Sequence, residues 1–589
     1  MNHANQNRRR NPGRTSSVDS FEHDRLRRLI DLGIALSAER NHDRLLEQIL
    51  LEAKSLTNAD GGTLYLMDES GGLCFEIVHN DKLAIAMGGT TGRPVPFPPL
   101  RLYDPETGQP NHHNVATHAA LSNSVITIED AYNAKDFDFS GTKKFDASTG
   151  YRSKSFLTVP LRNYHGDVIG VLQLINARDD EGAVSVFTDE IVPLITALAS
   201  QAAIAIDNQR LIEAQKKLLE SFIQVIAHAI DAKSPYTGGH CVRVPVITEM
   251  LVKAAHDSRD PAFADFHLSE DQFYELHLAA WLHDCGKVTT PEYVVDKSTK
   301  LETIYDRIHE IRTRFEVLRR DAEIAFLRDC QAGGDVSELQ ARFDARCREL
   351  QEQYAFVAES NLGSEFFGPD KVARLKEIGA QTWTRYFDRT TGLAWTESTR
   401  CKDVPPPPAT ERLLEDRPDQ ITDRFNLGEL YNLSIGRGTL TAEERRIIND
   451  HIVVTIDMLN KLPLPKHLRS LPEIAGAHHE KMDGTGYPRG LKRAEMSVPA
   501  RAMAIADIFE ALTAADRPYK KPKTLSESIK IMSNMNKSQH IDPDLFDLFL
   551  RDGVFKEYAT KFLLPEQIDD FDITPYFSKM EVVEQQQHV

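Results

Sequence analysis

Residues 478–488 read His-His-Glu-Lys-Met-Asp-Gly-Thr-Gly-Tyr-Pro, and a second dense stretch, His-Asp-Cys-Gly-Lys, occupies residues 283–287. Both lie in apolar, helix-forming parts of the chain that are rich in histidine and aspartate. No serine nucleophile arrangement accompanies them, whereas imidazole and carboxylate groups together suit divalent metals. The candidate metal ligands are His240, His283, Asp284, His451, His478, His479 and Asp507.

The donor types narrow the choice of metal. Imidazole nitrogen favours Fe, Zn or Ni, while carboxylate oxygen admits Mn or Mg. We therefore expect Fe or Mn first, with Zn and Mg left open. If it stood alone, an adjacent pair such as His478 and His479 would more often have a structural role. Together with the other candidate ligands, the pair indicates a metal centre.

The loop from Asp483 to Pro488 combines Gly484 and Gly486 with Tyr487 and a proline. Such a turn is rigid and lets a planar or phosphate-bearing ligand approach the backbone closely. Tyr487 could equally belong to the core. The loop is a candidate substrate-binding element beside the metal ligands.

Length and charge limit the number of domains and the kinds of binding partner. With 589 residues the chain should hold three or four compact units or large insertions. The net charge of −18 and the pI of about 5.6 argue against non-specific binding to nucleic acid or to an anionic membrane, although a local basic pocket remains open. The hydrophobic share of 41% is that of a globular protein with buried cores.

Cysteine usage and the apolar segments bear on localisation. The six cysteines are scattered without a C-x-x-C pair, which is typical of reduced intracellular thiols. The most apolar stretch, 191–206, contains polar residues and falls short of a membrane span. Residues 1–20 lack the apolar core of a secretory signal and are expected to be a disordered tail. We expect a cytoplasmic protein.

The first third of the chain predicts an α+β domain over 21–210. Two helices with apolar residues at helical spacing come first, followed by short β-branched runs separated by turn residues. A helical pattern then continues to Asp231, with Leu211, Gln215, Leu218 and Phe222 at steps of four and three. We expect a connector helix over 205–231 that pairs two chains in parallel. A single helix packed on its own domain is the alternative.

Two helical segments, 232–301 and 437–545, hold the histidines and aspartates. Between them, 302–436 differs in character and is expected to be a mainly helical insertion. It begins with a charged helical stretch whose apolar face includes Ile304, Ile308 and Ile311, whereas its later Pro405–Pro408 run cannot be helical. Residues 546–589 are expected to be a C-terminal extension.

Residues 40–210 resemble a GAF domain. The resemblance is carried by Gly61-Gly62-Thr63-Leu64-Tyr65-Leu66, by the run from Ile169 to Asn176 and by the closing helix Ala199 to Asn208. It implies a six-stranded sheet with flanking helices that binds an unknown small molecule or dimerises. Where the nucleotide-binding subset has an Asn-Lys pair, this chain has Asn176-Ala177.

A more specific resemblance is to the HD-GYP family. It is carried by the 283–287 and 478–488 stretches, by Ala506-Asp507 and by Arg517-Pro518-Tyr519. It implies an all-helical, two-metal phosphodiesterase that linearises and degrades cyclic di-GMP. By this resemblance His240, His283, Asp284 and Asp507 would hold one ion, and Asp284, His451, His478 and His479 the other, so that Asp284 bridges them.

The remaining site residues follow from the same resemblance and from position. Lys287, one turn beyond His283, suits a contact with phosphoryl oxygens or the leaving group, so Asp284 and Lys287 are the predicted catalytic residues. The predicted substrate-binding residues are Lys233, Arg243, Asp483, Gly484, Gly486, Tyr487, Pro488, Arg517 and Lys520. The step from Asp507 to Arg517 is ten residues where nine is commoner in the family.

The insertion creates two candidates for one histidine ligand, His309 and His451. In the family the ligand lies eleven residues beyond a leucine that starts the helix, and Leu440 plus eleven gives His451. Thr441 is also an apt N-cap with glutamates after it, and we expect its helix to continue unbroken past His451.

These observations lead to one functional prediction and one main alternative. The prediction is a cytosolic enzyme that hydrolyses cyclic di-GMP to linear pGpG and is regulated by its GAF domain, with further hydrolysis to GMP left open. The alternative is a cyclic dinucleotide receptor with little or no turnover. A third hypothesis, hydrolysis of a different phosphoester by a generic HD site, is weakened by the complete Gly484–Pro488 signature.

Overall fold

The computed structural model describes residues 27, 30–233, 239–364, 366–401, 404–422, 425–515 and 522–578. The predicted disordered tail, 1–20, lies outside these residues. The chain divides into two compact units, Met1–Leu219 and Glu220–Val589, which we describe separately.

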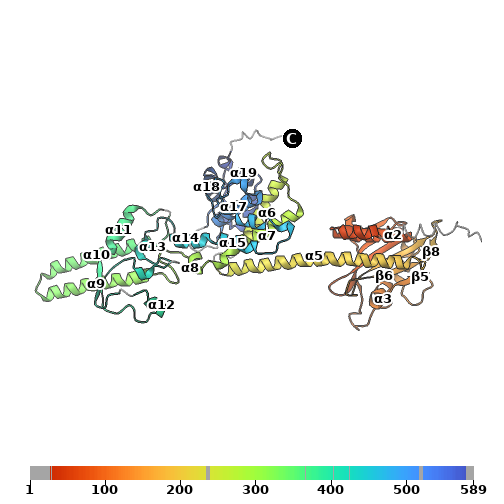
Figure 1. Cartoon of the computed structure of the whole chain (residues 1–589), viewed down its shortest axis with the longest axis horizontal. Coiled ribbons are helices and arrows are strands. Elements are labelled where there is room, and N and C mark those ends of the chain that lie inside the picture. The colour runs from red at the N-terminus through yellow and green to blue at the C-terminus, as the bar shows by residue number, and fades with distance from the viewer. Residues whose placement is uncertain are drawn as a thin grey trace, which may run out of the picture. The chain divides into compact units, whose positions relative to one another are not determined.

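The N-terminal unit is built on one antiparallel sheet with the strand order β3-β2-β1-β7-β6-β5, to which β4 adds beside β2 and β8 beside β7 (Figure 1). Along each central strand, successive side chains point to opposite faces of the sheet. The strand bounds are β1 Ala59–Met67, β2 Gly72–Asn80, β3 Ile85–Gly88, β4 Leu100–Arg101, β5 Ile126–Ile128, β6 Phe156–Arg162, β7 Val168–Arg178 and β8 Val184–Ser185.

Helices cover both faces of this sheet. Leu64 and Leu172 pack with helix α2 and the first half of α5, whereas their neighbours Tyr65 and Val171 pack with α3 on the other face. Asn41 caps α2 by accepting from the backbone of Arg44. Residues 30–38 are also helical. The helix bounds here are α2 His42–Thr57, η1 Gly89–Thr91, α3 Val115–Ser122, α4 Ser140–Thr149 and α5 Val192–Lys233.

Helix α5 is one continuous helix of 42 residues. Its beginning is buried against the sheet, with Ile195 and Ile206 both fully buried. Further along, Leu211, Leu218 and Val225 are 54%, 57% and 65% exposed. These three apolar residues, spaced seven apart, therefore form an exposed apolar stripe within the single chain.

In its described residues the C-terminal unit is helical, apart from one two-stranded hairpin in its insertion. Its main core unites residues of α6, α7 and α16–α20, and buried Phe549, Phe555 and Tyr558 carry this core past residue 545. The bounds of this part are α6 His240–Asp257, α7 Glu270–Leu282, η2 Cys285–Thr289, α8 Glu292–Val295, α14 Ala442–Asn449, α15 His451–Asn460, η4 Lys466–Leu468, α16 Leu471–Gly476, η5 Arg493–Glu495, α17 Val498–Thr513, α18 Leu525–Lys537, α19 Pro543–Arg551, α20 Val554–Phe562, η6 Pro565–Gln567 and η7 Thr574–Tyr576. The predicted α+β domain followed by a helical domain is confirmed.

The segment between α8 and α14 has a core of its own. Helices α9 and α10 contact each other along their length, and β9 and β10 form an antiparallel hairpin. The bounds are α9 Ile308–Gln331, α10 Val336–Asn361, α11 Pro369–Gly379, β9 Thr382–Arg385, α12 Trp395–Ser398, β10 Ala409–Arg412, η3 Pro418–Gln420 and α13 Glu429–Leu433. Ile308 and Ile311 are buried as predicted, but Ile304 precedes the helix and is 97% exposed, so its predicted place on the apolar face is wrong.

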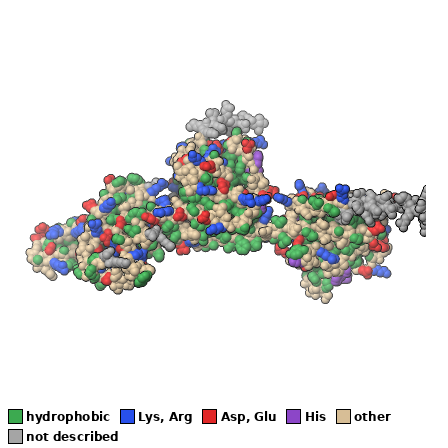
Figure 2. Space-filling view, in the orientation of Figure 1, with side chains coloured by type: hydrophobic (Ala, Val, Ile, Leu, Met, Phe, Trp, Pro, Cys, Tyr) green, Lys and Arg blue, Asp and Glu red, His purple; other side chains and the backbone are tan. Residues whose placement is uncertain are grey.

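Charge and apolarity on the surface agree with the composition. On the face drawn in Figure 2, blue lysine and arginine side chains and red acidic ones are interspersed over both units. Among the described residues, none of the helices combines the length and apolarity that crossing a bilayer requires.

Candidate metal centre

Two helix ends and a tight turn bring the first ligands together. His240 is the first residue of α6, and His283 follows the last residue of α7. Asp284 precedes the 3-10 turn η2, which packs on α15. At Gly286 of that turn, a Cβ atom would lie 2.0 Å from the carbonyl oxygen of His451, so only glycine permits this approach. The close packing sets Asp284 beside His451.

His451 lies where its spacing predicts, at the start of α15. Thr441 and Glu444 form a capping box that begins α14. The prediction of one unbroken helix is wrong, because α14 ends at Asn449 and α15 begins at His451. His309 is instead exposed on α9, where its Nδ1 lies 2.7 Å from the Arg312 guanidinium.

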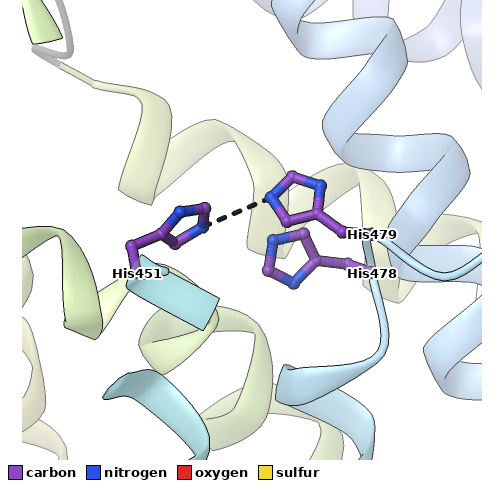
Figure 3. A group of neighbouring side chains, drawn as sticks. All are labelled: His451, His478 and His479. Atoms are coloured by element: carbon purple, nitrogen blue, oxygen red, sulfur yellow. Dashed lines mark hydrogen bonds between the residues drawn. The ribbon is translucent and has the colours of Figure 1, made fainter. Parts of the chain in front are cut away.

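All seven predicted ligands lie in one cluster. The structure groups their donor atoms in three overlapping sets, each with atoms within 4.8 Å of one another: His451 with His478 and His479, His240 with His283 and Asp507, and His283 with Asp284 and His478. Figure 3 shows His451 facing the His478–His479 pair, with a dashed line between His451 and His479.

Asp284 stands between two of these sets. Its Oδ2 lies 3.1 Å from His240 Nε2 and 3.2 Å from His283 Nε2, while its Oδ1 lies 3.2 Å from His451 Nε2. The carboxylate is 2% exposed. One oxygen therefore faces each side of the cluster, which is the arrangement that a bridging ligand needs.

Hydrogen bonding and burial leave the donor atoms available for a metal. His283 and His478 each direct Nδ1 at a backbone carbonyl 2.8 Å away. His451 directs Nδ1 at the carbonyl of Ile448, so in all three rings Nε2 keeps its lone pair. The buried Nε2 of His478 and Oδ1 of Asp284 have no hydrogen-bond partner among the described residues. Unpaired buried polar atoms are costly, and a metal ion would satisfy both.

The charge states of His478, His479 and Asp284 fit metal binding. Burial, and then the neighbouring His283, lowers the pKa of His478 to about 4, and burial beside His478 lowers the pKa of His479 well below its usual value. Burial opposes ionisation of Asp284, but Lys287 and His283 outweigh it and hold its pKa well below the usual range. Neutral imidazoles and an ionised carboxylate are the ligand forms that metals bind.

Lys287 reaches this carboxylate although it is not on a helix continued from His283. It lies in η2, and its Nζ is 2.5 Å from Asp284 Oδ2 while its side chain keeps 27% exposure. Burial alone would lower its pKa, but Asp284 and Asp507 raise it. The ammonium is thus charged and partly open at the edge of the cluster.

The 478–488 loop covers the histidine pair. The Tyr487 ring stacks on His479 at 4.9 Å between centroids and 20° between planes. At Gly486 a Cβ atom would lie 2.3 Å from the backbone nitrogen of Lys481, so the loop folds back on itself only with glycine there. Pro488 follows Tyr487 through a cis bond, and Gly484 has a φ of 83°. The buried Glu480 fixes the loop by accepting from the backbone of Arg489 and Leu491.

Several predicted substrate-binding residues have protein partners instead. Lys233 donates to the carbonyl oxygen of Val288 at 2.6 Å, and Arg243 binds Glu510. Asp483 is exposed, and its carboxylate accepts from the backbone and hydroxyl of Thr485. Arg517 and Lys520 lie outside the described residues.

Sequence reasoning missed Glu480 and Glu510. Glu480 directly follows the histidine pair, and Glu510 lies one turn after Asp507 on α17. Their positions beside ligands were the available signal, but a glutamate is usually solvated, and only the tertiary packing shows that these two are buried.

A sheet domain followed by a helical domain with a buried histidine and aspartate cluster defines a two-domain protein with a candidate metal site. Residues 41–206 match the GAF domain family, and residues 423–545 match the HD domain family. The chain therefore contains a GAF domain followed by an HD domain, and HD domains are metal-dependent phosphohydrolases. The second match includes His451 and Asp507 but not His240 or His283.

Curated relatives resemble parts of this chain. A 3'3'-cGAMP-specific phosphodiesterase 3 of Vibrio cholerae is 41% identical over 109 residues, 18% of this chain and 23% of that protein. A cyclic di-GMP phosphodiesterase of Thermotoga maritima is 37% identical over 114 residues, 19% and 30% of the two chains. A probable cyclic di-GMP phosphodiesterase of Vibrio cholerae is 30% identical over 190 residues, 30% and 41%. The matches span 23% to 41% of the length of these relatives.

Proposed function

We propose that this protein is a metal-dependent phosphodiesterase that hydrolyses cyclic di-GMP to linear pGpG and, in a second hydrolysis, to GMP. The observation that carries the proposal is Asp284, a buried carboxylate with one oxygen toward His240 and His283 and the other toward His451. The relatives named as cyclic dinucleotide phosphodiesterases supply the substrate class.

The residues that would hold two divalent ions are those of the cluster. His240, His283, Asp284 and Asp507 would take one ion, and Asp284, His451, His478 and His479 the other. Mixed nitrogen and oxygen donors favour Fe or Mn, with Zn and Mg open. Two such ions supply an activated water and neutralise charge on the phosphoryl group.

The chain's own groups act around these ions. Lys287 offers a charged ammonium at the cluster edge, suited to a phosphoryl oxygen or the leaving 3′ oxygen. Tyr487, aligned by its stack on His479, offers a ring face beside the site. Gly484, Gly486 and Pro488 shape the loop for a close approach by the nucleotide, and Arg517 and Lys520 remain predicted phosphate contacts.

The decisive experiment is incubation of metal-reconstituted protein with cyclic di-GMP, followed by chromatography of the products. Linear pGpG or GMP would support the proposal. A parallel reaction with 3'3'-cGAMP tests the substrate named for the first relative. Tight binding of cyclic di-GMP without product would instead support the receptor function.

We also propose that the GAF domain regulates this site through α5. The last residue of that helix, Lys233, donates to the carbonyl of Val288 next to Lys287, and Asp231 accepts from the backbone of Gly239 next to His240. The end of α5 therefore contacts the segments that carry Lys287 and His240. A displacement of the helix would reach both.

A cavity in the GAF domain favours a particular class of ligand. It has a volume of about 420 Å³ between β1, β2 and α3, and is lined by aromatic rings such as Phe75 and Phe145. Among the described residues, its lining includes neither lysine nor arginine, whereas the pKa of the lining residue Asp138 is lowered because its carboxylate accepts from the backbone N–H of Ser140. Burying a phosphate there would leave its charge unpaired. The expected ligand is an uncharged aromatic molecule.

Val78→Trp is expected to fill this cavity, because Val78 lines it from β2. Binding of the neutral fluorescent probe N-phenyl-1-naphthylamine should weaken at least tenfold by fluorescence titration. The control Val184→Trp changes a residue of the same sheet outside the cavity, 38% exposed, and should bind like the wild type. Displacement of the probe by cyclic AMP or cyclic GMP would contradict the expected ligand class.

Leu218→Glu is expected to convert a homodimer to a monomer. We propose that two copies of α5 pair in parallel along the exposed stripe from Leu211 to Val225. Pairing would bury Leu218, and a negative charge at a buried heptad position opposes pairing. Light scattering at micromolar concentration measures the mass. Leu327→Glu on α9, a leucine of similar exposure at 52%, is the matched control. A wild-type protein that is monomeric would contradict the prediction.

A further inference from the structure

The histidine ligands differ in what holds their second ring nitrogen. In His283, His451 and His478 the Nδ1 atom faces a carbonyl three residues earlier in the chain. His240 differs from them in its position, as the first residue of α6. Its Nδ1 lies 2.5 Å from the Oε2 atom of Glu510 on α17.

Glu510 is itself firmly held. Its side chain is fully buried, and its other oxygen accepts from Arg243 at 2.8 Å from Nε and 2.6 Å from Nη2. Arg243 lies one turn after His240 on α6, as Glu510 lies one turn after Asp507 on α17. His240 and Arg243 of α6 therefore lie against Asp507 and Glu510 of α17. One face of α17 supplies both the ligand Asp507 and the carboxylate that contacts His240 Nδ1.

An anionic acceptor behind an imidazole has a defined effect on a metal ligand. It fixes the tautomer with the proton on Nδ1, orients the ring and makes Nε2 a stronger donor than a neutral carbonyl does. Loss of such a partner lowers metal affinity by roughly 10-fold to 100-fold.

Resting on the proposed two-metal function, we infer that Glu510 is a positioning residue for His240 and sets the affinity of the ion held by His240, His283 and Asp507. The ion at His451, His478 and His479 does not depend on it. The two metal positions therefore differ in what stabilises them, and Arg243 serves this arrangement by holding Glu510 rather than by binding substrate.

The test is the metal affinity of Glu510→Gln, measured by competition with a chromophoric chelator and by metal content per chain. An amide cannot accept from Arg243 and His240 on both of its atoms. We expect one ion to bind roughly 10-fold to 100-fold more weakly while the second ion is retained. The matched control is Glu275→Gln, which alters a buried carboxylate outside the cluster that accepts from the backbone of Ser470 and Leu471. It should leave both affinities unchanged.

Glu510→Asp provides a second variant that keeps the charge and the pairing with Arg243 but shortens the reach to His240. It should weaken the same ion by less than Glu510→Gln does. Wild-type protein with two ions and unchanged affinities in both Glu510 variants would overturn the inference and leave the proposed function standing. Wild-type protein that binds no divalent ion would overturn both.

Discussion

Asp284→Asn is expected to abolish hydrolysis of cyclic di-GMP while leaving the fold intact. The carboxylate faces both histidine groups, so the amide removes negative charge and one ligand atom from two ions at once. It also releases Lys287, whose ammonium pairs with the same carboxylate. We expect a fall in kcat of roughly 1,000-fold or more, since loss of about 4 kcal/mol of transition-state stabilisation has that effect.

The measurement is turnover of cyclic di-GMP under saturating metal, with metal content and circular dichroism recorded on the same samples. Asp457→Asn changes an exposed aspartate on α15 and should retain full activity. Retained turnover in Asp284→Asn with two bound ions would contradict the bridging role.

Much of the site could be predicted because its residues lie in short, dense motifs. The 283–287 and 478–488 stretches contain most of the predicted ligands. The loop glycines predict close backbone contacts, and at Gly486 a Cβ atom would lie only 2.3 Å from the Lys481 nitrogen. The antiparallel sheet followed by a helical domain could also be predicted, because period-two and helical patterns are local properties of a sequence.

What failed depended on long-range packing. Nothing local to Ile304 shows that the helix starts four residues later, and nothing local to Asp450 shows that α14 and α15 are separated at this one residue. The partner of Arg243 is 267 residues away in sequence, so its contact with Glu510 carries no local signal. The sequence therefore could not show that a buried carboxylate holds Arg243, and the predicted contact of Arg243 with substrate stays a prediction.

Because of the insertion between α8 and α14, two histidines are candidates for the same ligand position, His309 in the insertion and His451 after it. The choice between them tests the predicted set of metal ligands. The insertion is anchored next to the helices that precede His451, because the buried Lys297 binds Glu444 of α14 at 2.8 Å and Lys300 donates to the carbonyl of Leu433 at 2.9 Å. These contacts bring the two halves of the helical domain together across the insertion. They hold α14 in place, and α15 follows it directly.

His451→Ala is expected to remove the ion bound by His451, His478 and His479 and to reduce turnover of cyclic di-GMP by roughly 1,000-fold, comparable to the effect at Asp284. His451 Nε2 lies 3.2 Å from Asp284 Oδ1 and 3.2 Å from His479 Nε2, so no other described side chain occupies its place in the cluster. His309→Ala is the matched control, since it only removes an exposed ring beside Arg312 and Tyr305. It should keep both ions and full activity. Metal content per chain and turnover are measured for both variants, and loss of an ion in His309→Ala with full activity in His451→Ala would show that the second metal is completed by the insertion.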